Sequence, residues 1–123
     1  MLAALEALVK LESPTEDLAA CQDVVRLASE LATTILGTPA QIRDVNGRPV
    51  FWWGAENPDV VVLAHLDTVW PKGSFTPLWK VEGNKATSPG IFDMKAGFIQ
   101  ALYAMKGITG SAALVATTDE ETG

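Results

Sequence analysis

The sequence contains one cysteine and one histidine, and these low counts limit the kinds of site that it can build. A single cysteine, Cys21, forms no intrachain disulfide and supports no zinc site made of thiolates. Because Cys21 lies among apolar residues at helical spacing, we expect a small buried side chain there. Any metal ligands would come from His65 and from the carboxylates.

Basic residues are few and scattered, which argues against partners that carry dense negative charge. The chain has 9 lysines and arginines against 15 acidic residues, a net charge of -6, and no basic cluster. We therefore expect no binding to nucleic acid or to anionic membranes. The opening segment lacks the basic start of a secretory signal, and no apolar run approaches the roughly 18 residues that span a bilayer. These absences predict a soluble, cytoplasmic protein.

Two common catalytic signatures are also missing. No glycine-rich loop leads into lysine followed by serine or threonine, which argues against a nucleotide site. Ser74 and Ser88 lie outside any Gly-x-Ser-x-Gly elbow, so a serine–histidine triad fits poorly. The 123 residues, 48% of them apolar, suit one small folded domain or part of a larger one. We therefore treat residues 1–123 as a single unit.

The spacing of apolar residues predicts three helices. The first covers residues 2–12 and the third covers residues 92–107. The second follows "SPTED", with Ser13 or Thr15 as its N-cap and Gly37 directly after its end. Its buried face is expected to consist of Leu18, Cys21, Val25, Ala28, Leu31, Ala32 and Ile35.

The strands are predicted from turn signals and from short apolar runs. Asn46-Gly47 is a strong hairpin signal, and a second hairpin is expected around Gly83-Asn84. Residues 60–64, "VVVLA", are apolar throughout, which predicts a central strand covered on both faces. Residues 112–118, "AALVATT", form a second buried strand. Strand, helix and strand in this order predict a right-handed crossover and an α/β fold, with a mostly parallel sheet flanked by helices.

Polar clusters follow both predicted parallel strands. His65 and Asp67 come directly after the first strand, and Asp119, Glu120 and Glu121 come directly after the second. Asp93 precedes the helix that connects the two strands. Functional crevices of parallel sheets lie beyond the carboxyl ends of the strands, so we expect these residues to meet at one edge.

The types of residue in these clusters suit a metal site, although each cluster also has a simpler interpretation. Side chains two apart in an extended segment point the same way, so His65 can bind a metal while Asp67 holds its other ring nitrogen. Alternatively, Asp67 only orients a structural histidine. Asp93 can bridge two cations, or it can be a plain N-cap. One histidine with several carboxylates is a ligand set suited to zinc or manganese.

Glu120 and Glu121 are neighbours and therefore point to opposite sides of an extended backbone. One of them can then bind a metal while the other stays free to move protons, which is the division of labour that a hydrolytic site needs. The alternative is that "TTDEETG" is a solvated acidic loop.

Three segments resemble the signatures of a known enzyme family. "AHLDTVWPKGSF", "SPGIFDMKAGF" and "TTDEETG" are similar in type, order and spacing to motifs of the zinc aminoacylase and glutamate carboxypeptidase family. That family includes acetylornithine deacetylases and succinyl-diaminopimelate desuccinylases. "HLDTVWPKG" most resembles the glutamate carboxypeptidase branch. The resemblance spans nearly the whole chain and implies part of a zinc-peptidase-like catalytic domain without its lid or dimerisation domain.

The resemblance also implies a role for each candidate residue. His65 would bind one zinc and Asp67 would orient it, while Asp93 would bridge two zinc ions and Glu121 would bind the second. Glu120 would be the general base and acid, acting on a water between the metals. Cobalt or manganese are the alternative metals.

The sequence departs from the family pattern in two ways. Ser88 and Ala96 stand where glycine is common, and family members continue far beyond "DEETG", with a further carboxylate ligand and a late histidine. Each zinc would then have two protein ligands instead of the usual three, so we expect weak metal binding and no significant hydrolysis by this chain alone. Asp119 has no role by this resemblance, and we expect it to be structural.

Two interpretations of different class stay open at this point. In the first, the chain is the amino-terminal part of a zinc amidohydrolase or carboxypeptidase that removes C-terminal amino acids, glutamate among them, or N-acyl groups from amino acids. Small peptides or N-acyl amino acids would be its substrates. In the second, it is a non-catalytic α/β domain that serves binding or assembly. An exposed strand edge would favour homo-oligomers in either case.

Overall fold

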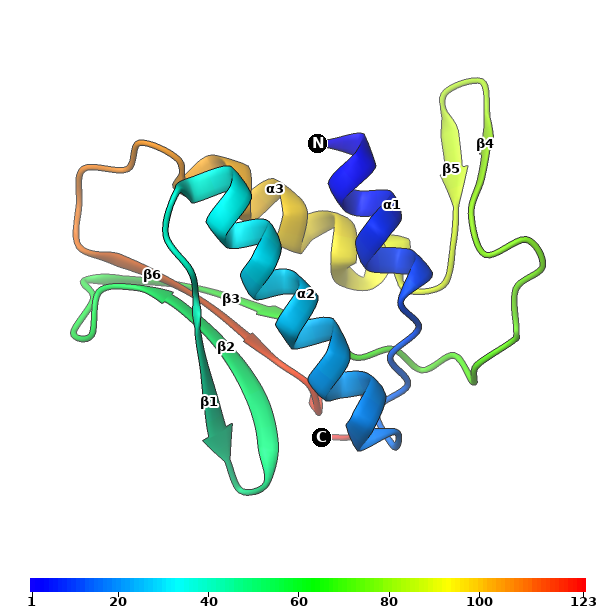
Figure 1. The fold of residues 1–123 in the computed structure, drawn as a ribbon, viewed down its shortest axis with the longest axis horizontal. Helices are drawn as coiled ribbons and strands as arrows, with labels where there is room; N and C mark the ends of the chain where they lie inside the picture. Colours follow the sequence, from blue (N-terminus) through cyan, green and yellow to red (C-terminus); the bar gives the residue numbers. More distant parts are fainter.

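The computed structural model describes residues 1–123 as three helices packed on one face of a four-stranded sheet, with a small separate hairpin (Figure 1). The helices are α1 (Leu2–Lys10), α2 (Leu18–Leu36) and α3 (Ala96–Met105). The strands of the main sheet are β1 (Gln41–Val45), β2 (Arg48–Gly54), β3 (Val60–His65) and β6 (Ala112–Thr117). The hairpin is formed by β4 (Lys80–Glu82) and β5 (Lys85–Thr87).

Helix α2 is confirmed, but its start differs from the prediction. Asp17 is the N-cap, and its side chain accepts the backbone N–H of Ala20 at 2.9 Å. Ser13 and Thr15 lie upstream and use their hydroxyls elsewhere. Leu18, the first residue of the helix, was expected on the buried face and is 41% exposed. The end of the helix is as expected.

Both predicted hairpins are present. Asn46 and Gly47 have positive φ values of 54° and 80°, which two-residue hairpin turns of type I′ require, and Val45 pairs with Arg48 across the turn. Strands β4 and β5 pair around Gly83 in the second hairpin, which forms a separate two-stranded sheet.

The α/β fold is confirmed, but the main sheet is mixed instead of mostly parallel. The strand order is β1-β2-β6-β3. Only β3 and β6, the strands joined by α3, pair in parallel; β2 pairs antiparallel with both β1 and β6. The parallel pairing of β3 with β6 was predicted correctly. The prediction did not include the β1–β2 hairpin in the same sheet, where it adds two antiparallel strands beside β6. The helices that flank the sheet all lie against one of its faces (Figure 1).

Strand β3 was predicted to be central and is instead an edge strand. Its residues Val61 and Leu63 are 52% and 67% exposed, whereas β6 is buried almost throughout. The two strands have the same apolar character, and only the long-range pairing of β6 with β2 decides which of them lies inside the sheet. The continuous apolar run therefore predicted the strand correctly but predicted the wrong position for it within the sheet.

The main core lies between the helices and the inner face of the sheet. Phe51 of β2 and Phe98 of α3 make an edge-to-face contact with ring centroids 5.1 Å apart, and both side chains are fully buried. The buried residues around them come from all three helices and include Leu8, Val24, Val25, Leu102 and Leu114. Cys21 is buried as predicted. None of the helices has the length and apolar character that crossing a bilayer demands.

Candidate metal centre

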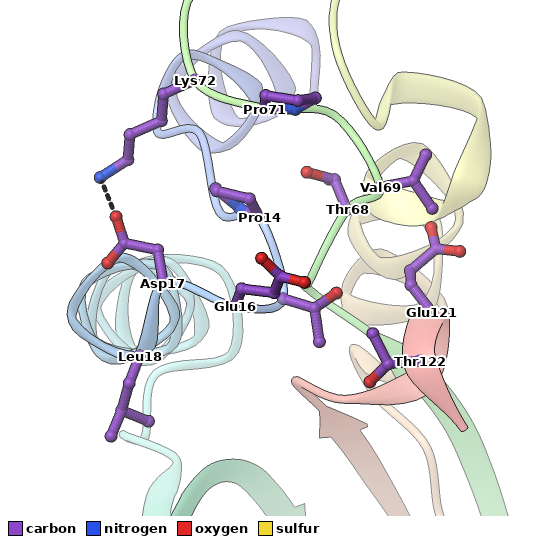
Figure 2. A pocket seen from close by; sticks show the side chains of 11 residues that line it. Pro14, Glu16, Asp17, Leu18, Thr68, Val69, Pro71, Lys72, Glu121 and Thr122 are labelled. Atoms are coloured by element: carbon purple, nitrogen blue, oxygen red, sulfur yellow. Dashed lines mark hydrogen bonds and ion pairs between the residues drawn. The ribbon is translucent and has the colours of Figure 1, made fainter.

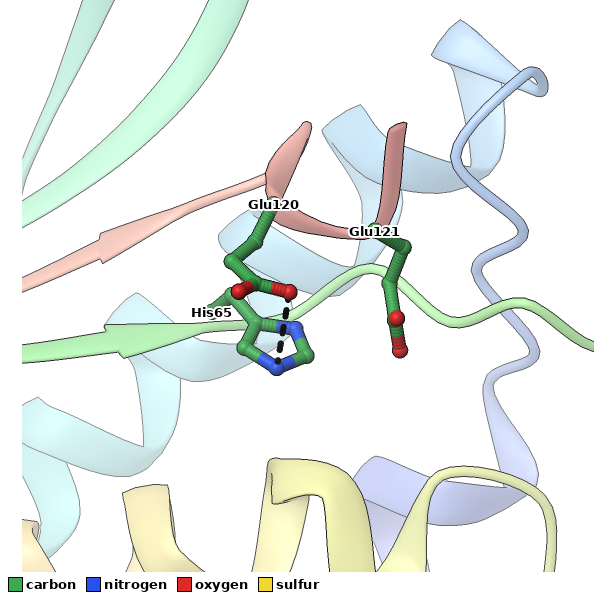
Figure 3. Close-up of side chains that lie close together, drawn as sticks. All are labelled: His65, Glu120 and Glu121. Carbon is green, nitrogen blue, oxygen red and sulfur yellow. Dashed lines mark ion pairs between the residues drawn. The ribbon is translucent and has the colours of Figure 1, made fainter. Parts of the chain in front are cut away.

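The carboxyl ends of β3 and β6 meet at one edge of the sheet, as parallel pairing requires. His65, the last residue of β3, pairs in register with Thr117, the last residue of β6. Shortly after β6 the chain forms a short 3₁₀ turn, η2 (Glu120–Thr122), which brings both glutamates towards His65 (Figure 3). A short turn, η1 (Ile91–Lys95), brings Asp93 to the same imidazole. The fold thus gathers the sequence-predicted residues, except Asp119, around one histidine.

The outer ring nitrogen of His65 faces two carboxylates. Its Nε2 atom lies 3.0 Å from Asp93 Oδ1 and 3.7 Å from Glu120 Oε2. The imidazole is almost completely buried, whereas the side chains of Asp93 and Glu120 are 71% and 59% exposed. The imidazole is therefore held rigidly while the carboxylates opposite it can adjust to a ligand.

The inner ring nitrogen of His65 faces the buried residue Asp67. His65 Nδ1 lies 3.3 Å from Asp67 Oδ1 and 3.2 Å from the backbone carbonyl oxygen of Asp67. Asp67 Oδ1 has no other polar neighbour, and Oδ2 accepts hydrogen bonds from the Thr15 hydroxyl at 2.7 Å and from the Glu121 N–H at 3.2 Å. Asp67 is thus placed to orient the ring, the arrangement in which a carboxylate leaves the opposite imidazole nitrogen for a metal.

The two glutamates do not point to opposite sides as an extended backbone would require. Because they lie in the η2 turn, a carboxylate oxygen of each and a ring nitrogen of His65 all lie within 4.8 Å of one another (Figure 3). Glu121 is half-buried and Glu120 is exposed. The three donors form a cluster that a cation can occupy, and Glu120 belongs to it together with the two predicted ligands.

Asp93 is not a helix cap. Its backbone lies outside the helical region, with φ -120° and ψ 98°, and its side chain caps no N–H. The turn fits against Thr68 because Gly90 has φ 65° and no side chain; a Cβ there would lie 2.4 Å from Thr68 Cγ2. The carboxylate of Asp93 contacts His65 instead. Asp119 is exposed and likewise caps no N–H of its turn.

The charges of the site alter the pKa values of its members. The Asp67 carboxylate, followed by that of Asp93, raises the pKa of His65 to about 9 against the opposing effect of burial. Burial opposes ionisation of Asp67, but hydrogen bonds from His65, Thr15 and the Glu121 N–H hold its pKa below the usual value. Burial and the neighbouring charge of Asp93 raise the pKa of Glu121. A bound cation would relieve this crowding of negative charge.

Three residues that support the site were not predicted from the sequence. Ser13 donates to the carbonyl of Leu66 at 2.6 Å, and Thr15 donates to Asp67. Lys95 is fully buried, and its Nζ donates to the carbonyl of Leu11 at 2.9 Å, which ties the η1 turn to the end of α1. Burial lowers the pKa of Lys95 to about 8. In the sequence, only the polarity of these residues among apolar neighbours could have indicated a role. For Ser13 and Thr15 that polarity was already explained by the predicted N-cap.

A cavity of about 780 Å³ opens beside the cluster (Figure 2). It lies between the start of α2 and the segment from Thr68 to Lys72, and Glu121 belongs both to its wall and to the donor cluster. Lys72 closes one side through an ion pair with Asp17, whose atoms lie 2.6 Å apart. The volume falls in the range of small-molecule sites.

Comparison with known proteins gives a consistent answer in sequence and in fold. No protein-family model matches the chain. Carboxypeptidase G2 from Pseudomonas sp. (strain RS-16) is 35% identical over 78 residues, which cover 57% of this chain and 19% of that protein. The crystal structure of the M20 family metallo-carboxypeptidase Sso-CP2 from Sulfolobus solfataricus matches 98% of this chain and 31% of its own, with a TM-score of 0.77 and 18% identity.

The chain resembles carboxypeptidase G2 in sequence and an M20 family metallo-carboxypeptidase in fold. The family resemblance drawn from the three motifs and the expectation of a partial zinc-peptidase-like domain are thereby confirmed. The chain spans less than a third of the length of either relative. The M20-like part therefore comprises one sheet with its helices and the edge that carries His65.

Proposed function

We propose that this chain carries part of the active site of a zinc-dependent amidohydrolase or carboxypeptidase. The reaction would remove a C-terminal amino acid, such as glutamate, or an N-acyl group from an amino acid. The observation that carries the proposal is the group of donors around His65, with Glu120 and Glu121 inside 4.8 Å and Asp93 at 3.0 Å. The names of the two relatives, a carboxypeptidase and a metallo-carboxypeptidase, support the same reaction class.

The spacing of these donors fits zinc. Zinc binds nitrogen and oxygen ligands at about 2.0–2.1 Å, so two ligand atoms on one tetrahedral ion lie about 3.3 Å apart. The distance from His65 Nε2 to Asp93 Oδ1, 3.0 Å, is close to that value, and an oxygen of Glu121 lies within 4.8 Å of a ring nitrogen of His65. His65, Asp93 and Glu121 would hold the metal ions. Cobalt and manganese accept the same ligand types.

Each residue of the chain would have a separate task in the reaction. The metal, when bound, would polarise the scissile carbonyl and lower the pKa of a coordinated water. Glu120, which is exposed and lies 3.7 Å from the outer ring nitrogen, would take a proton from the attacking water and pass it to the leaving amine. Asp67 would keep the proton of His65 on Nδ1, so that Nε2 faces the metal. The cavity beside Glu121 would receive part of a small peptide.

The number of ligands leads us to propose that this chain does not hydrolyse substrate by itself. His65 and Asp93 are two ligands for one ion, and Asp93 and Glu121 are two for the other, where catalytic zinc usually has three. Zinc-dependent release of an amino acid from acyl-amino acids or small peptides by the purified 123-residue chain would contradict this part of the proposal.

Elemental analysis tests whether the donor cluster binds metal. At equilibrium with a known concentration of free zinc, we expect bound zinc in the wild-type chain and at least about a tenfold weaker affinity after Glu121→Gln. Asp119→Asn is the matched control, because it removes a neighbouring charge that lies outside the cluster. Equal zinc content in all three proteins, or none in the wild type, would count against a metal site here.

A second function, assembly without catalysis, is favoured by one observation. The edge strand β3 exposes Val60, Val61 and Leu63, with 58%, 52% and 67% of their surfaces accessible. Such an edge can pair with a second copy of the chain. Assembly and metal binding are compatible, so the zinc measurement does not decide between them, and a variant of β3 is needed.

A further inference from the structure

A buried hydrogen bond, followed by a close polar contact, connects the segment before α2 with the imidazole. The Thr15 hydroxyl donates to Asp67 Oδ2 at 2.7 Å, and Oδ1 of the same carboxylate lies 3.3 Å from His65 Nδ1. Thr15 is 4% exposed and Asp67 is fully buried. Water therefore cannot replace the Thr15 hydroxyl without a rearrangement.

We propose that Thr15 is a positioning residue, which acts on His65 by fixing the rotation of the Asp67 carboxylate. A carboxylate that is held at Oδ2 has Oδ1 left to face the ring, and the ring then presents Nε2 to the donor cluster. The effect of Thr15 on metal binding rests on the proposed function. The orientation of Asp67 and His65 that Thr15 fixes is present without metal.

The backbone around Thr15 is built to hold this hydroxyl in place. The N–H of Thr15 donates to the carbonyl of Thr68 at 3.2 Å, and the N–H of Thr68 donates to the carbonyl of Ser13 at 2.9 Å. Pro14 and Thr68 pair like neighbours in a parallel ladder. The segment before α2 is thus joined by backbone bonds to the segment that contains Asp67, on both sides of the hydroxyl.

No competing task explains the Thr15 hydroxyl. Asp17 caps α2, so Thr15 is not needed for the helix start. The other donor to Asp67 Oδ2 is the Glu121 N–H at a longer distance of 3.2 Å. Without the hydroxyl, this single bond from a different segment would hold the carboxylate. Ser13 offers the matched comparison, because it is equally buried but donates to the backbone carbonyl of Leu66.

The sole histidine makes the proposal directly measurable by nitrogen-15 NMR of the metal-free chain. The wild type should show a His65 Nδ1–H proton protected from solvent exchange. Thr15→Val, which keeps the shape and loses the hydroxyl, should exchange this proton at least about ten times faster. Thr15→Ser should restore protection, and Ser13→Ala should leave it unchanged. Equal protection in Thr15→Val and wild type, or equal loss in Ser13→Ala, would overturn the proposal.

A measurement on the unchanged chain covers the case in which Thr15→Val does not fold. The Thr15 hydroxyl proton should itself exchange slowly and show proximity to the protons of residue 67; a freely exchanging hydroxyl would overturn the proposal. Zinc titration of the variants measures the effect on metal binding, and Thr15→Val should weaken the affinity for zinc about tenfold. If the exchange results hold and no protein binds zinc, the proposed function fails while the role of Thr15 stands.

Discussion

The two ring nitrogens of His65 face different surroundings. Its Nδ1 atom faces the buried carboxylate of Asp67, and its Nε2 atom faces the exposed carboxylates of Asp93 and Glu120. Both sides are negative, which raises the pKa of His65 to about 9, so the metal-free ring is protonated at neutral pH. A metal ion at Nε2 must displace that proton, because only the neutral nitrogen binds a metal.

This raised pKa predicts how the stability of the metal-free chain depends on pH. The folded pKa of about 9 lies above the ordinary 6.5, so the stabilisation is complete below the unfolded value and is lost as pH rises towards 9. We expect the free energy of unfolding to fall by about 2 kcal/mol between about pH 6 and about pH 8. Urea titrations of the metal-free chain measure this.

His65→Gln is the control for that measurement and should remove the decrease. The lowered pKa of Lys95 acts in the opposite sense, since a folded value of about 8 against 10.5 lets stability rise with pH above about pH 8. The comparison therefore belongs below that value. A profile that is flat in the wild type, or that stays steep in His65→Gln, would contradict the assigned cause.

At the scale of single elements, the η2 turn decides what the two glutamates can do. A 3₁₀ turn places neighbouring side chains closer in direction than a strand does, so both carboxylates reach the cluster. They differ in environment: Glu121 is half-buried and carries a raised pKa, and Glu120 is mostly exposed. The half-buried side chain is the better ligand, and the exposed one is the better proton carrier.

Glu120→Gln tests this division of labour. We expect zinc affinity to change less than about threefold, because a base that does not bind the metal can lose its charge without loss of a ligand. Glu121→Gln should lose about tenfold or more. Competition with a chromogenic chelator measures both. Equal losses in the two variants would assign Glu120 to the metal and leave the proton transfer without a candidate.

The elements also show what the sequence can predict. Turn chemistry is local, so Asn46-Gly47 predicted its hairpin correctly, and the parallel crossover placed His65 and Glu121 at one edge. The edge position of β3 depended on pairing between β2 and β6, which no local pattern encodes. Thr15 was assigned to the wrong partner because the same hydroxyl suits an N-cap and a carboxylate, and only the tertiary structure selects between them.

At the scale of the whole molecule, the helices cover one face of the sheet and leave the other face to its own side chains. On that second face Val50, Ala113 and Val115 are buried, with the Trp52 ring packed beside them and the guanidinium of Arg43 4.0 Å above that ring. Val61 and Leu63 pair in register with Ala113 and Val115 and expose apolar surface at the free edge. Surface of this kind commonly marks a contact with another chain.

Leu63→Lys tests whether β3 drives self-association. A lysine on an edge strand opposes pairing with a second strand, and because Leu63 is 67% exposed the substitution should change stability by less than about 0.5 kcal/mol. We expect the wild type to form dimers or larger species at high concentration and Leu63→Lys to stay monomeric in sizing with light scattering. Ile42→Lys, on the opposite edge strand and 49% exposed, should still associate. A monodisperse wild-type monomer would contradict the prediction.

Strand β3 carries a free edge along its length and a proposed metal ligand at its last residue. A strand that pairs with this edge would lie beside the residue that holds the metal, so association of chains and occupancy of the site would be energetically coupled. By mass action, the apparent zinc affinity would then rise with protein concentration, and zinc would in turn favour the associated form.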